Sequence, residues 1–308
     1  MHQFNKLLIA LDTRLEGHPL AELGPAVARS NASAVTVVDA VPEVSWLARI
    51  VGSELDKLRS EARAGVEAKV KELASLFTSQ GVASEAKLLD GTAWLAITNE
   101  AKGGDYDLVM ASEREGEDQA NGFLGRTARR LLRNCPLPLW LVPAGASPEV
   151  RHVLACVDTG SENSVDSELN DRVYRLAASI AEQQGARLSL LHAWDMEDEL
   201  VLRARLRPPA VESFLKKARD YRAHLLDRFL QQYNASLDDD HIHLCKGAPE
   251  DVVSEFCSKH TVDLVVMGTV ARSGLAGVVL GNTAERILEK ITSPVLAVKP
   301  FHLETASS

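Results

Sequence analysis

The second half of this chain repeats the first half. Lys6-Leu-Leu-Ile-Ala-Leu-Asp12 returns as His152-Val-Leu-Ala-Cys-Val-Asp158, and Asp107-Leu-Val-Met returns as Asp263-Leu-Val-Val-Met. The offset between equivalent positions grows along the chain, as expected when insertions collect in loops. The repeat therefore predicts two copies of one domain, at residues 1–145 and 149–301, joined by a short linker of small residues.

Length, charge and cysteine content narrow the class of protein. The 308 residues suit two domains of about 150 residues each. A net charge of −9 disfavours nucleic-acid binding, which needs a basic surface. We expect no membrane span, because no apolar run approaches about 18 residues. We also expect no secretory signal, because the first residues lead directly into a predicted strand. The four cysteines lack metal or redox spacing, which favours reduced thiols in a cytoplasmic protein.

Each half alternates short, apolar, β-branched segments with longer segments of helical periodicity. This pattern indicates an α/β fold with a parallel sheet covered by helices on both faces. The strands are expected at 6–11, 34–39, 83–89, 108–111, 137–142, 152–157, 187–193, 241–246, 264–267 and 295–299. Pro138 and Pro294 begin the last strand of each half, where a missing N–H is tolerated on an edge. We expect these two edges to pair, which would make the chain a pseudo-dimer of its own halves.

The segment that most clearly indicates a ligand-binding site is a glycine-rich run at residues 266–290. The run follows a strand and begins a helix, which is where open α/β sheets bind ligands. Gly268, at the strand end, would let a ribose or phosphate approach the backbone. Gly281, Asn282 and Thr283 begin the last helix, whose unpaired N–H groups favour an anion. A structural interpretation stays open, in which Gly268 ends a strand and Asn282 or Thr283 caps the helix.

These residues resemble the phosphate motif of the universal stress proteins. The motif is a glycine, two residues, a second glycine, nine residues, and a glycine followed by Ser, Thr or Asn. Gly268 and Gly281-Asn282 match it, whereas Ala271 replaces the second glycine. The resemblance extends to Lys246-Gly-Ala-Pro-Glu250, Asp263–Thr269, Leu280–Glu285 and Pro294–Pro300. The first half, with Leu131–Pro136 and Leu139–Val142, is similar to the tandem E-type members from bacteria.

The resemblance implies two Rossmann-like domains, each a doubly wound, five-stranded parallel sheet of strand order 3-2-1-4-5. It also implies a cytoplasmic role in stress, and some members bind ATP beside the Asp that ends strand one. Carried over, the nucleotide-binding residues are Val157, Asp158, Thr159, Ala193, Met267, Gly268, Ala271, Gly281, Asn282 and Thr283. The implied cofactor is ATP or another adenine nucleotide, with or without Mg²⁺. If position 271 needs a positive φ, alanine there costs on the order of 1 kcal/mol.

The first repeat departs further from the motif. Ser112 and Glu115 stand where the second repeat has Gly268 and Ala271, and acidic residues crowd 113–118. Carboxylates there would repel a polyphosphate. The sequence therefore predicts nucleotide binding in the second domain and a degenerate ligand site in the first.

Several other side chains have both a functional and a structural interpretation. Asp12 and Asp158 could contact Mg²⁺ or a ribose, or cap the next segment. His192 could lie near a ligand or simply belong to the core. His241 and His243 lie on one face of an expected strand and could bind zinc, although a polar turn and strand is the commoner outcome.

Two groups of arginines likewise have both a functional and a structural interpretation. One follows a helix face that could face solvent or dock an acidic partner: Arg126, Arg129, Arg130 and Arg133. The other precedes Pro208 in an expected loop that could act as a lid or bind an acidic headgroup: Arg203, Arg205 and Arg207.

No catalytic signature is present. The sequence has neither a Gly-x-Ser-x-Gly elbow nor a GxxxxGK[ST] phosphate loop, so we expect no dedicated enzyme and at most slow ATP hydrolysis. The expected function is adenine-nucleotide binding in the second domain with a regulatory or stress-resistance role. The alternatives are a stress scaffold that binds no nucleotide and a binder of a small apolar or lipid-like molecule. The sequence does not decide whether the chain forms a homodimer or binds an acidic or protein partner.

Overall fold

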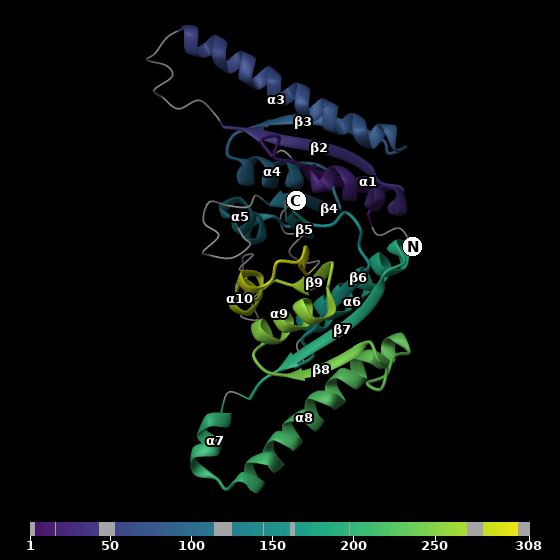
Figure 1. The fold of residues 1–308 in the computed structure, drawn as a ribbon, viewed down its shortest axis with the longest axis vertical. Coiled ribbons are helices and arrows are strands. Elements are labelled where there is room, and N and C mark those ends of the chain that lie inside the picture. Colours follow the sequence, from purple (N-terminus) through teal and green to yellow (C-terminus); the bar gives the residue numbers. More distant parts are fainter. Residues whose placement is uncertain are drawn as a thin grey trace.

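The structure, a computed structural model, describes residues 4–15, 17–42, 53–113, 125–143, 145–160, 164–196, 198–269 and 280–300. The first half contains β1 (Lys6–Ala10), α1 (Pro19–Asn31), β2 (Ala34–Val41), α3 (Ser53–Ser79), β3 (Ser84–Asp90), α4 (Ala93–Gly103), β4 (Leu108–Glu113), α5 (Arg126–Asn134) and β5 (Leu139–Pro143). The second half contains β6 (His152–Cys156), α6 (Ser164–Gln184), β7 (Arg187–Trp194), α7 (Glu199–Arg205), α8 (Pro208–Leu230), the 3₁₀ turn η2 (Gln231–Tyr233), β8 (Ile242–Lys246), α9 (Pro249–His260), β9 (Leu264–Gly268), α10 (Asn282–Lys290) and β10 (Val295–Val298) (Figure 1).

Within the described residues all ten strands belong to one sheet, in the order β3-β2-β1-β4-β5-β10-β9-β6-β7-β8. Each repeat is parallel and has the predicted 3-2-1-4-5 order. The matching edges β5 and β10 pair antiparallel, with Leu139 opposite Ala297 and Leu141 opposite Val295. The α/β fold and the internal pseudo-dimer are therefore confirmed, and the two sheets are continuous across the joint.

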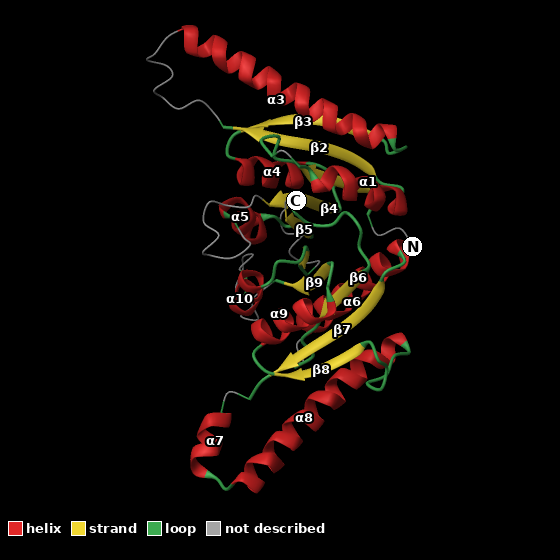
Figure 2. Cartoon of the chain, in the orientation of Figure 1, coloured by secondary structure: helices red, strands yellow, loops and turns green. Residues whose placement is uncertain are grey.

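Alternating side chains of the buried strands divide the core into two layers. In β1, Leu7 and Ile9 pack on one face while Leu8 and Ala10 pack on the other. Helices α1, α3, α6 and α8 supply the first layer, and α4, α5, α9 and α10 supply the second. Because a strand buried on both faces must be apolar throughout, the short β-branched runs of the sequence become central strands (Figure 2).

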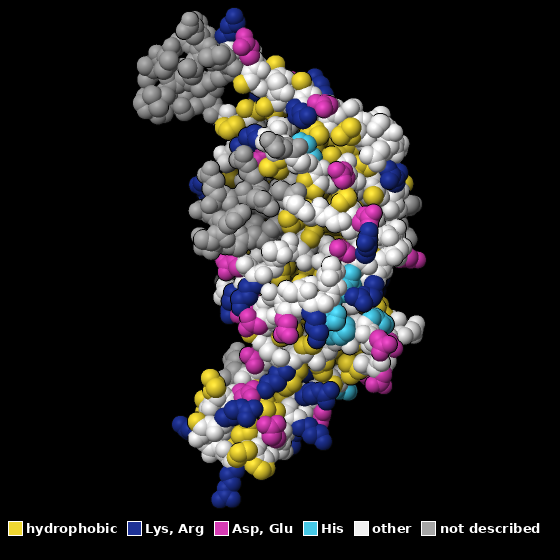
Figure 3. Space-filling model, viewed as in Figure 1, with side chains coloured by type: hydrophobic (Ala, Val, Ile, Leu, Met, Phe, Trp, Pro, Cys, Tyr) yellow, Lys and Arg dark blue, Asp and Glu magenta, His cyan; other side chains and the backbone are white. Residues whose placement is uncertain are grey.

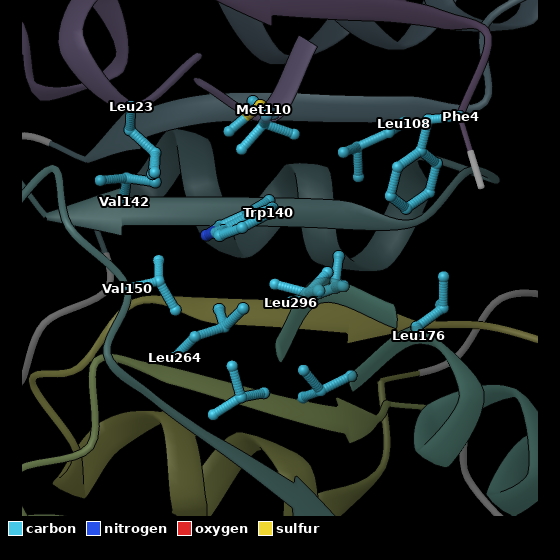
Figure 4. Close-up of a cluster of buried hydrophobic side chains, with 14 of the residues drawn as sticks. Phe4, Leu23, Leu108, Met110, Trp140, Val142, Val150, Leu176, Leu264 and Leu296 are labelled. Atoms are coloured by element: carbon cyan, nitrogen blue, oxygen red, sulfur yellow. The ribbon is translucent and has the colours of Figure 1, made fainter. Parts of the chain in front are cut away.

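The two repeats share a core at the β5–β10 joint. Trp140 of β5 lies opposite Leu296 of β10, and both side chains are fully buried (Figure 4). Lys299 follows β10 and is 1% exposed, and its Nζ donates a hydrogen bond to the carbonyl of Cys135 in the first repeat. Buried apolar contacts and this hydrogen bond therefore both hold the two repeats together at the joint.

The arginines of α5 are mostly exposed, and two of them pair with the other repeat. Arg133 Nη2 lies 2.6 Å from Glu285 Oε1, and Arg129 Nη2 lies 3.7 Å from Glu289 Oε1. Both glutamates belong to α10 of the other repeat, while Arg130 lies over the ring of Trp94. Arg126, Arg130 and Arg133 are exposed, so the solvent-facing interpretation holds for most of this face, and Arg129 and Arg133 also pair with glutamates of the same chain.

The loop expected around Arg203 is a helix instead. Arg203 and Arg205 belong to α7, and Arg207 precedes α8. An ion pair of 2.7 Å between Arg203 and Glu199, one turn earlier, stabilises α7. Apolar and basic side chains adjoin on this lower projection of the molecule, where Leu200 is 81% exposed (Figure 3).

Each observed strand begins and ends within two residues of its predicted bounds. Cys135 and Cys257 are buried and all four cysteines are thiols. Among the described helices, none is both long and apolar enough to cross a lipid bilayer.

Candidate functional site

Three strand ends of the second repeat meet at one edge of the sheet. Strand β6 pairs in parallel with β7 on one side and with β9 on the other, so their carboxyl ends lie together. Val157, Asp158 and Thr159 follow β6, Ala193 lies near the end of β7, and Met267 lies near the end of β9. The predicted site residues on these strands are thus neighbours in space.

Helix α10 begins at the same edge. The N–H of Gly281 donates to the carbonyl of Thr269, with 2.9 Å between nitrogen and oxygen. Gly281 is the N-cap residue, with φ −69° and ψ 140°, and Asn282 and Thr283 are exposed in the first turn. Neither Asn282 nor Thr283 is therefore the cap that the structural interpretation proposed. The first N–H groups of any helix lack partners within it, which leaves this end suited to an anion.

Gly268 is explained by packing rather than by open space. A Cβ at Gly268 would lie 2.6 Å from Cδ2 and 3.0 Å from Cγ of Leu169, a residue of α6. The absence of a side chain lets α6 approach β9 closely, so a ligand does not account for this glycine. Ala271 lies outside the described residues.

We expect Gly268→Ala to lower the free energy of unfolding by about 1–3 kcal/mol, the usual cost of overpacking. Urea denaturation of four proteins tests the cause: wild type, Gly268→Ala, Leu169→Ala and the double variant. The cost of Gly268→Ala should be smaller when Leu169 is alanine, because the clashing atoms are gone. An equal cost in both backgrounds would show that Leu169 does not explain the glycine.

Asp158 is held by its backbone and presents its carboxylate at the surface. The side chain of Asn170 accepts a hydrogen bond from the N–H of Asp158 (2.9 Å) and donates one to its carbonyl (2.8 Å). The exposed carboxylate accepts from the N–H of Gly160 at 3.0 Å. Asn170 of helix α6 therefore holds the backbone of the turn after β6, while the carboxylate of Asp158 is exposed at the surface.

Buried polar atoms without partners gather at this edge. In the described residues, Thr159 Oγ1, His192 Nε2 and Thr269 Oγ1 have none, and their residues are 7%, 1% and 1% exposed. His192 Nδ1 lies 3.1 Å from the carbonyl of Val157, so it carries the proton and Nε2 is an acceptor. Burial lowers the pKa of His192, and the nearby charge of Arg222 lowers it further, which keeps the ring neutral.

In the first repeat, the counterparts of Asp158, Thr159 and His192 are already hydrogen-bonded within the chain. Asp39, the counterpart of His192, accepts hydrogen bonds from the N–H and hydroxyl of Thr13 at 2.9 and 2.7 Å. Asp12 is held by Arg14 through two contacts of 2.7 Å. Ser112, which replaces Gly268, has a buried hydroxyl that finds no partner among the described residues. Glu115 lies outside those residues.

The zinc alternative at His241 and His243 is not supported. His243 packs against the ring of Phe256, with 4.8 Å between ring centroids, and lies 6.2 Å from His260. Within the part of the chain that is described, no group of three or more His, Cys, Asp or Glu is arranged to hold a metal. This histidine belongs to an aromatic cluster between β8 and α9.

Two surface hollows lie away from this edge. One, of about 250 Å³, lies between α3 and β3 and is lined in part by Arg63, Lys71 and Lys87. The other, of about 460 Å³, lies at the opposite edge of the second repeat, beside Arg151 and Arg187. Both are lined largely by charged side chains, so neither favours an apolar ligand.

Comparison with known proteins identifies the family. The model of the universal stress protein family matches the chain twice, over residues 3–143 and 149–299. The chain belongs to the universal stress protein family. It is thus a tandem universal stress protein, which agrees with the resemblance in its sequence.

Relatives and solved structures agree with this membership. The universal stress protein E of Escherichia coli K12 is 26% identical over 253 residues, 80% of this chain and 79% of that one. The E homolog of Haemophilus influenzae is 27% identical over 205 residues, 67% of this chain and 66% of that one. A Pseudomonas aeruginosa protein described as functionally unknown has a TM-score of 0.75 at 19% identity, covering 99% of this chain and 98% of its own. At that identity the likeness shows the fold alone.

Sequence reasoning did not single out Arg222 as a candidate site residue. It lies within the buried stripe of α8, between Leu215 and the pair Leu225 and Phe229. A cation inside an apolar stripe is unusual because burying a charge is costly without a partner. That position was the signal available in the sequence.

Proposed function

We propose that the second repeat binds an adenine nucleotide at the carboxyl edge of β6, β7 and β9. The observation that supports this is the group of buried atoms without partners in the described residues: Thr159 Oγ1, His192 Nε2 and Thr269 Oγ1. Leaving a buried donor or acceptor unpaired costs about 1–3 kcal/mol per group. A ligand with hydroxyl and phosphate groups would remove part of that cost, which gives the free site a reason to bind one.

Each part of the nucleotide has a matching group at this edge. The N–H groups that begin α10 at Asn282 and Thr283, together with the helix dipole, would hold the 5′-phosphates. The exposed carboxylate of Asp158 would accept hydrogen bonds from ribose hydroxyls or bind Mg²⁺. The adenine would contact main chain near Ala193, at the end of β7.

The first repeat would serve as the structural partner of the second. Its Asp12 and Thr13 are already bonded to Arg14 and Asp39, so they offer a nucleotide fewer groups. Binding in the second repeat would then act through the shared sheet, by shifting a conformational or oligomeric balance under stress. A regulatory binding protein fits this better than a dedicated enzyme, and the cytoplasmic location stays a prediction.

A scaffold that binds no nucleotide is the second candidate. Its support is Leu169, whose side chain covers Gly268, the position expected to admit a ribose or phosphate. In that case the chain's own side chains would fill the proposed site at the carboxyl edge of β6, β7 and β9, and the two repeats would have a purely structural role.

Calorimetric titration of the full chain separates the two candidates. We expect ATP with Mg²⁺ to bind saturably, and adenosine to bind at least about tenfold more weakly because it lacks charge-assisted hydrogen bonds. Absence of heat at millimolar ATP, with the protein folded by circular dichroism, would leave only the scaffold.

A further inference from the structure

Arg222 of α8 reaches into the turn that follows β6. A Cβ at Gly160 would lie 2.0 Å from Nη1 of Arg222 and 3.1 Å from Oδ1 of Asp158. The guanidinium and the carboxylate therefore lie close together, beside the position that a Cβ of Gly160 would occupy. Arg222 is partly buried, and no hydrogen bond or ion pair joins its guanidinium to any described residue. A half-buried cation in this state is prepared to receive an anion.

The first repeat shows what a closed version of this arrangement looks like. Arg14 occupies the position of Gly160 and binds Asp12 through both carboxylate oxygens. In the second repeat the glycine removes that internal arginine, and Arg222 enters the vacated space from α8 without pairing to Asp158 in the same way. The internal ion pair of the first repeat is thus replaced by a guanidinium that an external anion can engage.

Neighbouring groups make the same place suitable for a phosphate. Thr159, next to Gly160, has a buried hydroxyl with no partner among the described residues. The charge of Arg222 also acts on His192, which places the guanidinium near the ends of both β6 and β7. The N-terminus of α10 lies beyond β9, on the other side of β6. Two separate anion positions therefore flank the carboxylate of Asp158.

We propose that Arg222 binds a phosphate carried on the ribose of the nucleotide, so that the second repeat prefers an adenine nucleotide phosphorylated at the 2′ or 3′ oxygen as well as at 5′. This rests on the proposed function, in which α10 holds the 5′-phosphate and Asp158 contacts the ribose. Nucleotide sites of α/β folds place at the ribose either a carboxylate, which reads its hydroxyls, or an arginine, which accommodates a phosphate on it, and this edge carries both kinds of group. A bidentate guanidinium suits that phosphate better than an ammonium does.

Titration of the full chain with 5′-AMP, adenosine 2′,5′-bisphosphate and adenosine 3′,5′-bisphosphate tests the proposal. We expect one of the bisphosphates to bind wild type roughly 10- to 100-fold more tightly than 5′-AMP. Arg222→Gln should remove this gain, so that neither bisphosphate binds more tightly than 5′-AMP. Arg222→Lys should keep part of the gain, and Arg219→Gln, an exposed arginine of the same helix, should keep all of it.

The outcomes separate this inference from the function on which it rests. Equal affinity of wild type for 5′-AMP and both bisphosphates would overturn the role of Arg222 and leave nucleotide binding in place. A loss in Arg222→Gln that is equal for 5′-AMP and the bisphosphates would do the same, because it would indicate a general effect on the site. Failure of every nucleotide to bind folded wild type would overturn both.

Discussion

Replacement of Trp140 by alanine is expected to lower the free energy of unfolding by about 3–5 kcal/mol, the usual loss for a buried tryptophan. Trp140 is fully buried where β5 pairs with β10, and it lies opposite Leu296 of the other repeat. Truncation would leave a cavity in the core that both repeats share. Urea denaturation followed by circular dichroism measures the loss, and the same variant should weaken the joint between the repeats.

Trp94→Ala provides the matched control. Trp94 lies on α4 of the first repeat, is only partly buried and packs under Arg130 away from the joint. Its truncation should cost about 1–2 kcal/mol, because less apolar area leaves water. The account of the joint would be wrong if the two tryptophans cost the same. A double-mutant cycle with Leu296→Ala should show coupling for Trp140 and none for Trp94.

Gly281→Asp is expected to weaken ATP binding by more than about hundredfold while leaving the chain folded. An aspartate at this N-cap position would satisfy the first N–H groups of α10 with its own carboxylate, which favours the helix. The same carboxylate would take the place proposed for the 5′-phosphates and repel them, removing about 3 kcal/mol or more of binding free energy. Calorimetry measures the binding, and thermal unfolding confirms that the helix is intact.

Gly125→Asp is the equivalent change in the first repeat. Gly125 is the N-cap residue of α5, so the two variants differ only in which repeat receives the carboxylate. We expect Gly125→Asp to leave the affinity for ATP within about twofold of wild type, since the bound phosphates are proposed to lie in the other repeat. Equal losses in the two variants would contradict an asymmetric site.

Much of the fold was predictable because buried parallel strands leave a strong local signal. The β1 run from Lys6 to Ala10 and its counterpart from His152 are apolar on both faces, as the two core layers require. Pro138 and Pro294 marked the edges that pair, and internal repetition then fixed the pseudo-dimer.

Contacts between distant segments explain what the sequence analysis missed. Leu169 meets Gly268, and Arg133 meets Glu285, only after helices from different parts of the chain pack together. Arg222 is a similar case, since its place beside Gly160 depends on how α8 crosses the sheet. Such pairs have no fixed spacing in sequence, so periodicity and motifs do not reveal them. Those predicted site residues of the second repeat that the structure describes do meet at one edge, but their roles stay proposals.

The number of nucleotides that one chain holds tests the central claim most directly. Native mass spectrometry of the full chain in the presence of ATP and Mg²⁺ should show a single added nucleotide, retained in Gly125→Asp and lost in Gly281→Asp. A spectrum with no added mass, or with two nucleotides on each chain, would contradict a binding site that the second repeat keeps and the first has lost.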